Sequence, residues 1–203
     1  MRVIAIIIGS WFLVEFYGYW LHVLLHSDRF RWLSRRHMTH HLHPKAYAPG
    51  KKMRSHEYRH VSEGHLQIVG LGLEWFIPSV ILIVVTALGE WAIGLTWSEI
   101  LLSEIILISY SIFLFGYLHD RMHVKDIWLL KSPFFRKWFL RARRNHDIHH
   151  NHITDHGLMK KNFGIAFPLY DHIFGTYQSR LKKLNRKGIE AAYERYSISP
   201  EER

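Results

Sequence analysis

The sequence contains no cysteine, and this absence excludes several kinds of redox and structural site. Without thiols the chain has no disulfide framework, no cysteine-ligated zinc site, no iron–sulfur cluster and no c-type haem attachment motif. Histidine, by contrast, occurs 17 times among 203 residues, roughly four times its average usage. If this chain performs redox chemistry, its electrons must therefore arrive from outside.

Charged residues are almost absent from three long apolar blocks, at residues 3–25, 66–88 and 97–118. Each block is long enough to cross a hydrocarbon core of about 30 Å. Residues 89–96 contain glycine and form the expected turn between the second and third blocks. The first block is not read as a signal peptide, because it lacks a small-residue cleavage site and ends in histidines followed by arginines. We therefore predict three membrane spans.

Positive charge is confined to the two polar segments at residues 28–65 and 119–203. Of the 27 lysines and arginines only Arg2 lies outside them. The positive-inside rule places both segments in the cytoplasm and the N-terminus outside. The net charge of +10 then indicates an anionic membrane surface as the partner, and no nucleic acid. The small size and the lack of a targeting segment favour a bacterial inner membrane.

The expected fold is all-α and integral to the membrane. Residues 1–203 are predicted to form a single membrane-embedded domain, because the composition shows no break and no repeat or low-complexity tract. Residues 134–143 are amphipathic and rich in aromatic side chains, so they are expected at the membrane interface. Three or four transmembrane helices would then anchor a cytoplasmic helical cap that holds a dimetal histidine site.

Ten histidines follow a pattern that occurs twice, HxxxH and then HxxHH. On a helix, residues three or four apart lie on one face about 5–6 Å from each other, so each motif is a chelating unit. The predicted topology brings all four motifs to the same side of the membrane. The ten residues are His22, His26, His37, His40, His41, His119, His123, His146, His149 and His150.

Ten imidazoles are too many for one ion but suit two ions with five or six ligands each. Imidazole binds iron, zinc, copper and nickel alike, so the ligand type alone does not identify the metal. The spacing of the motifs therefore predicts a two-metal site and leaves its occupant open.

The ordered motifs HVLLH, HMTHH, HDRMH and HDIHH resemble those of the fatty acid hydroxylase and sterol desaturase superfamily. The segment NFGIAFPLYDHIFGTY, at residues 162–177, is similar to the end of that family's domain. The resemblance covers roughly residues 15–178. As a set the motifs are highly specific, whereas any single one is weak.

The resemblance implies a non-haem di-iron oxygenase in which the ten histidines bind two iron ions, with zinc as an alternative occupant of the isolated protein. It implies O2 as co-substrate and hydroxylation or desaturation of a lipid C–H bond in a fatty acyl, sphingoid, sterol or carotenoid chain. No catalytic residue beyond the metal ligands is expected. Some members carry a fused cytochrome b5 domain. This chain has none, so a separate cytochrome b5-, ferredoxin- or rubredoxin-like protein is implied as electron donor.

Residues near the motifs are candidates for a supporting shell, because metal-bound imidazoles usually donate their second N–H to a neighbour. His152 is a candidate because it lies beside a motif, and Asp171 is a candidate because a carboxylate can orient a ligand imidazole. Glu15 is a candidate because it lies two turns before His22 and a carboxylate within a span requires a reason. Five further histidines receive no assigned role: His43, His56, His60, His156 and His172. Exposed positions in basic loops are the alternative for His43, His152, His156 and His172.

Two other functions remain as alternatives. His56, Glu57 and His60 match the HExxH motif of zinc proteases, but Arg59 places a charge inside the motif and the extended metzincin spacing is missed. A protein that transports or stores zinc or iron would place ionisable residues along a path through its spans. Here only Glu15 and Glu104 lie mid-span, which favours a fixed site.

Overall fold

The computed structural model describes residues 1–42, 73–123 and 127–198. Within these ranges the chain is almost entirely helical, and its only β-type pairing is an isolated bridge between Ile153 and Met159. The predicted all-α class is therefore confirmed.

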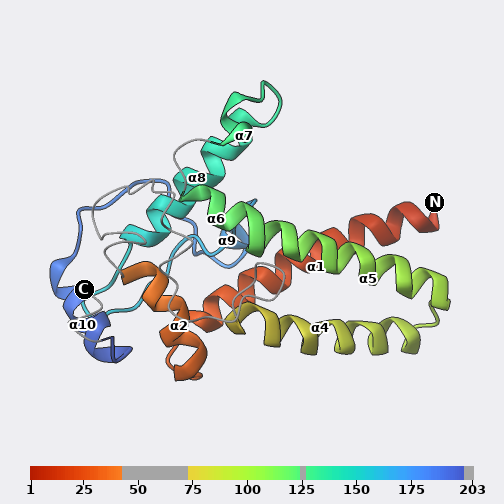
Figure 1. Ribbon diagram of the computed structural model, residues 1–203, viewed down its shortest axis with the longest axis horizontal. Coiled ribbons are helices and arrows are strands. Elements are labelled where there is room, and N and C mark those ends of the chain that lie inside the picture. Colours follow the sequence, from red (N-terminus) through yellow and green to blue (C-terminus); the bar gives the residue numbers. More distant parts are fainter. Residues whose placement is uncertain (43–72, 124–126, 199–203) are drawn as a thin grey trace.

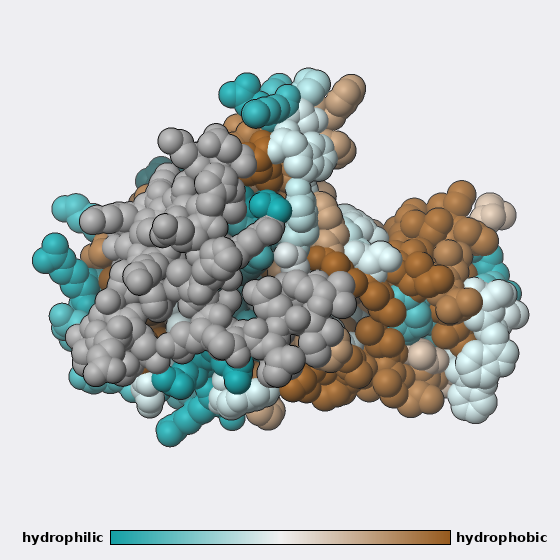
Figure 2. Space-filling model, in the orientation of Figure 1, coloured by the Kyte–Doolittle hydropathy of each residue, from teal (hydrophilic) through white to brown (hydrophobic). Residues whose placement is uncertain are grey.

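Three long helices lie side by side and form the elongated part of the molecule (Figure 1). Helix α1 is Arg2–Leu25, α4 is Leu73–Ala92, and α5 is Trp97–Ser111. Segments Arg2–Leu25, Glu74–Ala92 and Trp97–Met122 are long and apolar enough to cross a membrane. Figure 2 shows the hydrophobic surface gathered over this part. Side chains that face outward there, such as Ile8 on α1 and Val84 on α4, are about half exposed, as expected for a surface in contact with lipid.

The second span extends beyond its predicted end. We predicted a span at 66–88 followed by a glycine-containing turn at 89–96, whereas the helix runs on to Ala92. The predicted start at residues 66–72 lies outside the described ranges. In the added turn, Glu90 Oε1 accepts a hydrogen bond from the Ser103 hydroxyl of α5 at 2.5 Å.

The third span is longer than predicted and changes its helical type. A capping box of Thr96 and Glu99 starts α5, which continues as a π-helix, η2, over Ile112–Leu118 and then as α6, His119–Met122. The predicted end was residue 118, but the HDRM sequence stays helical. A π-helix bonds i to i+5, so it fits an extra residue into the turn, and such segments occur frequently at functional sites. Here it directly precedes the third histidine motif.

The remaining helices gather at one end of the three spans (Figure 1). They are α2, Arg31–Leu42; α7, Trp128–Lys131; α8, Arg136–Asn151; α9, Leu169–Ile173; and α10, Arg186–Arg195. Helix α10 is attached to this end by hydrogen bonds from Tyr193 and from Tyr196, the residue that follows the helix. Tyr193 donates to the Leu42 carbonyl at 2.9 Å, and Tyr196 donates to the His26 carbonyl at 2.8 Å.

Helices α8 and α9 also expose apolar side chains. The start of α8 buries Phe139 and exposes Leu140, while Phe134, just before it, is 87% exposed. Helix α9 lies along α1, where Tyr170 donates to the Phe12 carbonyl at 3.1 Å. Exposed aromatic and aliphatic side chains beside a span are typical of segments that lie in the membrane interface.

Candidate metal centre

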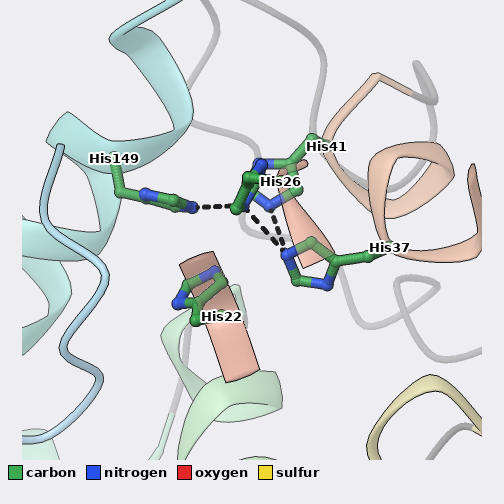
Figure 3. Close-up of side chains that lie close together, drawn as sticks. All are labelled: His22, His26, His37, His41 and His149. Carbon is green, nitrogen blue, oxygen red and sulfur yellow. Dashed lines mark hydrogen bonds between the residues drawn. The ribbon is translucent and has the colours of Figure 1, made fainter. Parts of the chain in front are cut away.

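The ten histidines of the four motifs come together in two groups of five. In each group one ring nitrogen per residue lies within 4.8 Å of all the others. The first group, shown in Figure 3, is His22, His26, His37, His41 and His149. The second group is His40, His119, His123, His146 and His150.

Each HxxHH motif contributes to both groups, because its i and i+4 residues share a helix face and its i+3 residue points slightly aside. On α2, His37 and His41 join the first group and His40 joins the second. On α8 the division is reversed, with His149 in the first group and His146 in the second. The groups adjoin, since the rings of His41 and His150 stack at 3.9 Å between centroids.

The spacing of the ring nitrogens fits ligands of a metal ion. In the first group, Nε2 of His37 lies 3.1 Å from Nε2 of both His26 and His41, and Nε2 of His149 lies 2.9 Å from that of His26. Two nitrogens bound at a right angle, each about 2.1 Å from one ion, lie about 3.0 Å apart. A hydrogen-bonded chain fits less well, since each nitrogen carries either one proton or one lone pair. A shared cation satisfies all of them.

Ring nitrogens without a hydrogen-bond partner also indicate a metal ion in each group. Nε2 of His22 and Nε2 of His119 are buried and have no hydrogen-bond partner among the described residues. A buried polar atom without a partner is costly and needs an explanation. Each group contains at least one such atom, so each group fits an ion.

Burial also keeps these imidazoles neutral. Desolvation lowers the pKa of His26, His37 and His41 well below the usual value, and burial lowers the pKa of His149 to about 3. A neutral imidazole has a free lone pair, so at neutral pH a metal ion need not displace protons from these residues.

Backbone carbonyls orient two histidines of the first group. His22 Nδ1 donates to the Phe163 carbonyl at 2.6 Å, and His149 Nδ1 donates to the Lys161 carbonyl at 2.7 Å. With the proton on Nδ1, the lone pair of each ring lies on Nε2, which faces the other histidines. The segment at residues 161–164 therefore fixes the tautomer of both rings.

Asp171 holds that segment in place. Its carboxylate is fully buried and accepts hydrogen bonds from the backbone N–H of Phe163 and Gly164, both at 2.8 Å, and from the Thr176 hydroxyl at 2.7 Å. Burial raises the pKa of Asp171. We predicted that Asp171 supports the histidines directly. In the structure Asp171 does not bond to these histidines. It holds the backbone at Phe163, whose carbonyl accepts a hydrogen bond from His22.

The other predicted supporting residues lie apart from both groups. Glu15 accepts a hydrogen bond from the Tyr110 hydroxyl of α5 at 2.6 Å. His152 follows α8 as its C-cap and belongs to neither group. His172 stacks on Tyr177 at 4.0 Å, and His156 is exposed. His43 and the HEYRH sequence at residues 56–60 lie outside the described residues.

One side chain against the site was not identified from the sequence. Trp75 is 4% exposed, and its ring centroid lies 5.7 Å from His22, 5.5 Å from His37 and 6.2 Å from His119. It stacks on Phe115 at 4.6 Å, so these two rings cover the side of the histidines that faces the spans. In the sequence Trp75 lies inside the predicted apolar block at residues 66–88, where an aromatic side chain is compatible with contact to lipid or to another span. Its contact with the histidines was therefore not predictable.

Comparison with known proteins adds a family to this geometry. The fatty acid hydroxylase family model matches residues 7–176, which include all four histidine motifs. No curated protein and no solved structure shows significant similarity to the chain. With a match over most of its length, the chain belongs to the fatty acid hydroxylase family.

Proposed function

We propose that this protein is a membrane-bound di-iron oxygenase that hydroxylates or desaturates a C–H bond of a membrane lipid. The observation that carries the proposal is the pair of adjoining groups of five buried histidines at the end of three apolar helices. Family membership supports lipid as the substrate class and iron as the metal.

Different residues would have different roles in this reaction. Five histidines in each group would hold one iron ion, and the two ions would supply activation of O2 for attack on an unactivated C–H bond. Residues 161–164 orient His22 and His149. Trp75 and Phe115 exclude water from the side facing the spans. The chain has no thiol or other redox side-chain centre, so a separate electron-transfer protein would deliver the electrons.

A cavity of about 660 Å³ gives a lipid access to the first group, because His26 is part of its wall. Tyr19, Trp20 and Val23 provide apolar lining, and Lys160 and Lys161 lie at its edge. This arrangement suits an amphiphile with hydrocarbon against the aromatic rings and a polar end near the lysines. We infer that the substrate enters here.

Filling this cavity is expected to block the reaction without loss of metal. Val23→Trp places an indole in the cavity one turn before His26, so we expect lipid hydroxylation to fall at least about tenfold with unchanged iron content. Val80→Trp is the matched control, because Val80 faces outward on α4 and is 43% exposed. Equal activity in both variants would show that the substrate takes another route.

The histidine end is proposed to lie in the cytoplasm, because nearly all lysines and arginines flank it. The absence of cysteine permits a clean test. Lys183→Cys lies at the histidine end, and Ile93→Cys lies in the turn at the opposite end of the spans. In intact cells a membrane-impermeant maleimide is expected to label only Ile93→Cys, and Lys183→Cys should react only after permeabilisation. The reverse pattern would invert the orientation.

The function itself is tested with purified protein, a chemical or protein reductant, isotopically heavy O2 and a membrane lipid extract. We expect about two iron ions per chain and a lipid product that carries one heavy oxygen atom. For desaturation the product instead lacks two hydrogens and carries no label. Bound zinc with no O2-dependent product would favour a metal-handling role.

A further inference from the structure

A second cavity, of about 630 Å³, lies between the start of α8 and residues 166–179. Three cations line it: Lys137, Arg141 and Arg144. Their spacing of four and three residues places them on one face of α8. This cavity shares no lining residue with the one that contains His26.

The positive charge of this cavity is not neutralised by acidic side chains in its lining. Its lining residues include no aspartate or glutamate. Arg144 donates to the Ser179 carbonyl at 3.4 Å, a neutral partner. Lys137 and Arg141 are exposed. Three positive charges around one hollow with no acidic lining residue favour an anionic ligand.

Aromatic side chains also line the cavity and connect it to a membrane span. The ring centroids of Trp138 and Phe167 lie 6.0 Å apart, and the ring centroid of Phe167 lies 5.4 Å from that of Trp11 on α1. At the mouth, Phe134 is 87% exposed, and Leu140 on the same helix is 43% exposed. Basic side chains beside exposed aromatic and aliphatic ones are typical of segments at the level of lipid headgroups.

We infer that this cavity binds the phosphate-bearing headgroup of an anionic phospholipid, with Lys137 and Arg141 as its principal contacts. The cations meet the phosphate, and the lipid's acyl chains extend past Phe134 and Phe167 toward the bilayer. The ligand is bound and is not transformed, and the inference does not depend on the reaction at the histidines. Because α8 carries His146 and His149, a lipid held here also fixes this helix at the membrane surface.

The test measures thermal unfolding of the full chain in detergent with short-chain phosphatidylglycerol, short-chain phosphatidylcholine or inorganic phosphate. We expect phosphatidylglycerol to raise the Tm in a saturable way and phosphatidylcholine to have little effect. The double variant Lys137→Gln with Arg141→Gln is expected to weaken the apparent Kd for phosphatidylglycerol about tenfold or more. Its Tm without lipid should match that of wild type, since both side chains are exposed.

The matched control removes the same charge nearby. Lys131→Gln with Arg136→Gln neutralises two exposed cations on α7 and α8 that do not line the cavity, and it should retain wild-type lipid binding. Equal loss in both double variants would reduce the effect to general surface charge and overturn the site. A full effect of inorganic phosphate alone, or equal effects of the two lipids, would likewise overturn an anionic-lipid site.

Discussion

Replacement of His26 or His123 by alanine is expected to abolish lipid hydroxylation, with a loss of at least about 100-fold. His26 Nε2 has close contacts with two other histidines of the first group, and His123 Nε2 lies 2.9 Å from that of His146 in the second. Even residues that only orient metal ligands cost about 10–100-fold in affinity or activity when they are changed. Loss of a ligand should cost more.

Metal content distinguishes this loss from misfolding. Each variant should retain about one of two iron ions per chain by elemental mass spectrometry, because each substitution affects one group. His156→Ala and His172→Ala are the controls, since both residues lie outside the two groups. Full iron content in the His26 and His123 variants, or equal losses in the controls, would contradict the assignment of ligands.

Asp171→Ala is expected to have the next largest effect, although this residue touches no histidine of the two groups. The substitution removes the acceptor of one buried and two partly buried hydrogen bonds, and each donor left unpaired in a buried position costs about 1–3 kcal/mol. The segment at residues 161–164 should then loosen, and His22 and His149 would lose their fixed tautomers. We expect a Tm lower by several degrees and iron affinity weaker by about 10–100-fold.

Two measurements separate the effects of Asp171 on stability and on the site. Thermal unfolding reports the first, and iron retention during dialysis against a chelator reports the second. Asp155→Ala is the control, because Asp155 is exposed and accepts a hydrogen bond from Asn185 at 2.6 Å, away from the histidines. If Asp171→Ala lowers the Tm but retains iron as wild type does, Asp171 supports the fold alone and not the histidines.

The histidine motifs were predictable because their geometry is local. A helix places i, i+3 and i+4 close together wherever it lies, so the sequence shows that the histidines of each motif lie near one another. The distribution between the two groups is not local. His40 and His41 are neighbours in the sequence but belong to different groups, and only the packing of α2 between the span ends and α8 decides this.

The orienting carbonyls and the end of the second span were not predictable, because the residue type or local hydropathy carries no sign of them. The carbonyls of Lys161 and Phe163 orient the rings, but a backbone group leaves no signature in residue type. The second span runs on to Ala92 and includes Glu90, which accepts a hydrogen bond from Ser103 on another helix. Hydropathy along one segment cannot report such a partner.

The π-helix Ile112–Leu118 affects how the two ends of the last span are oriented relative to each other. An α-helix turns by about 100° for each residue, so the extra residue in a wide turn rotates everything after it relative to what precedes it. Residues 97–111 lie in the apolar part of the span, whereas His119 and His123 belong to the second histidine group. The wide turn therefore changes the direction in which these two histidines face relative to the lipid-facing side of α5.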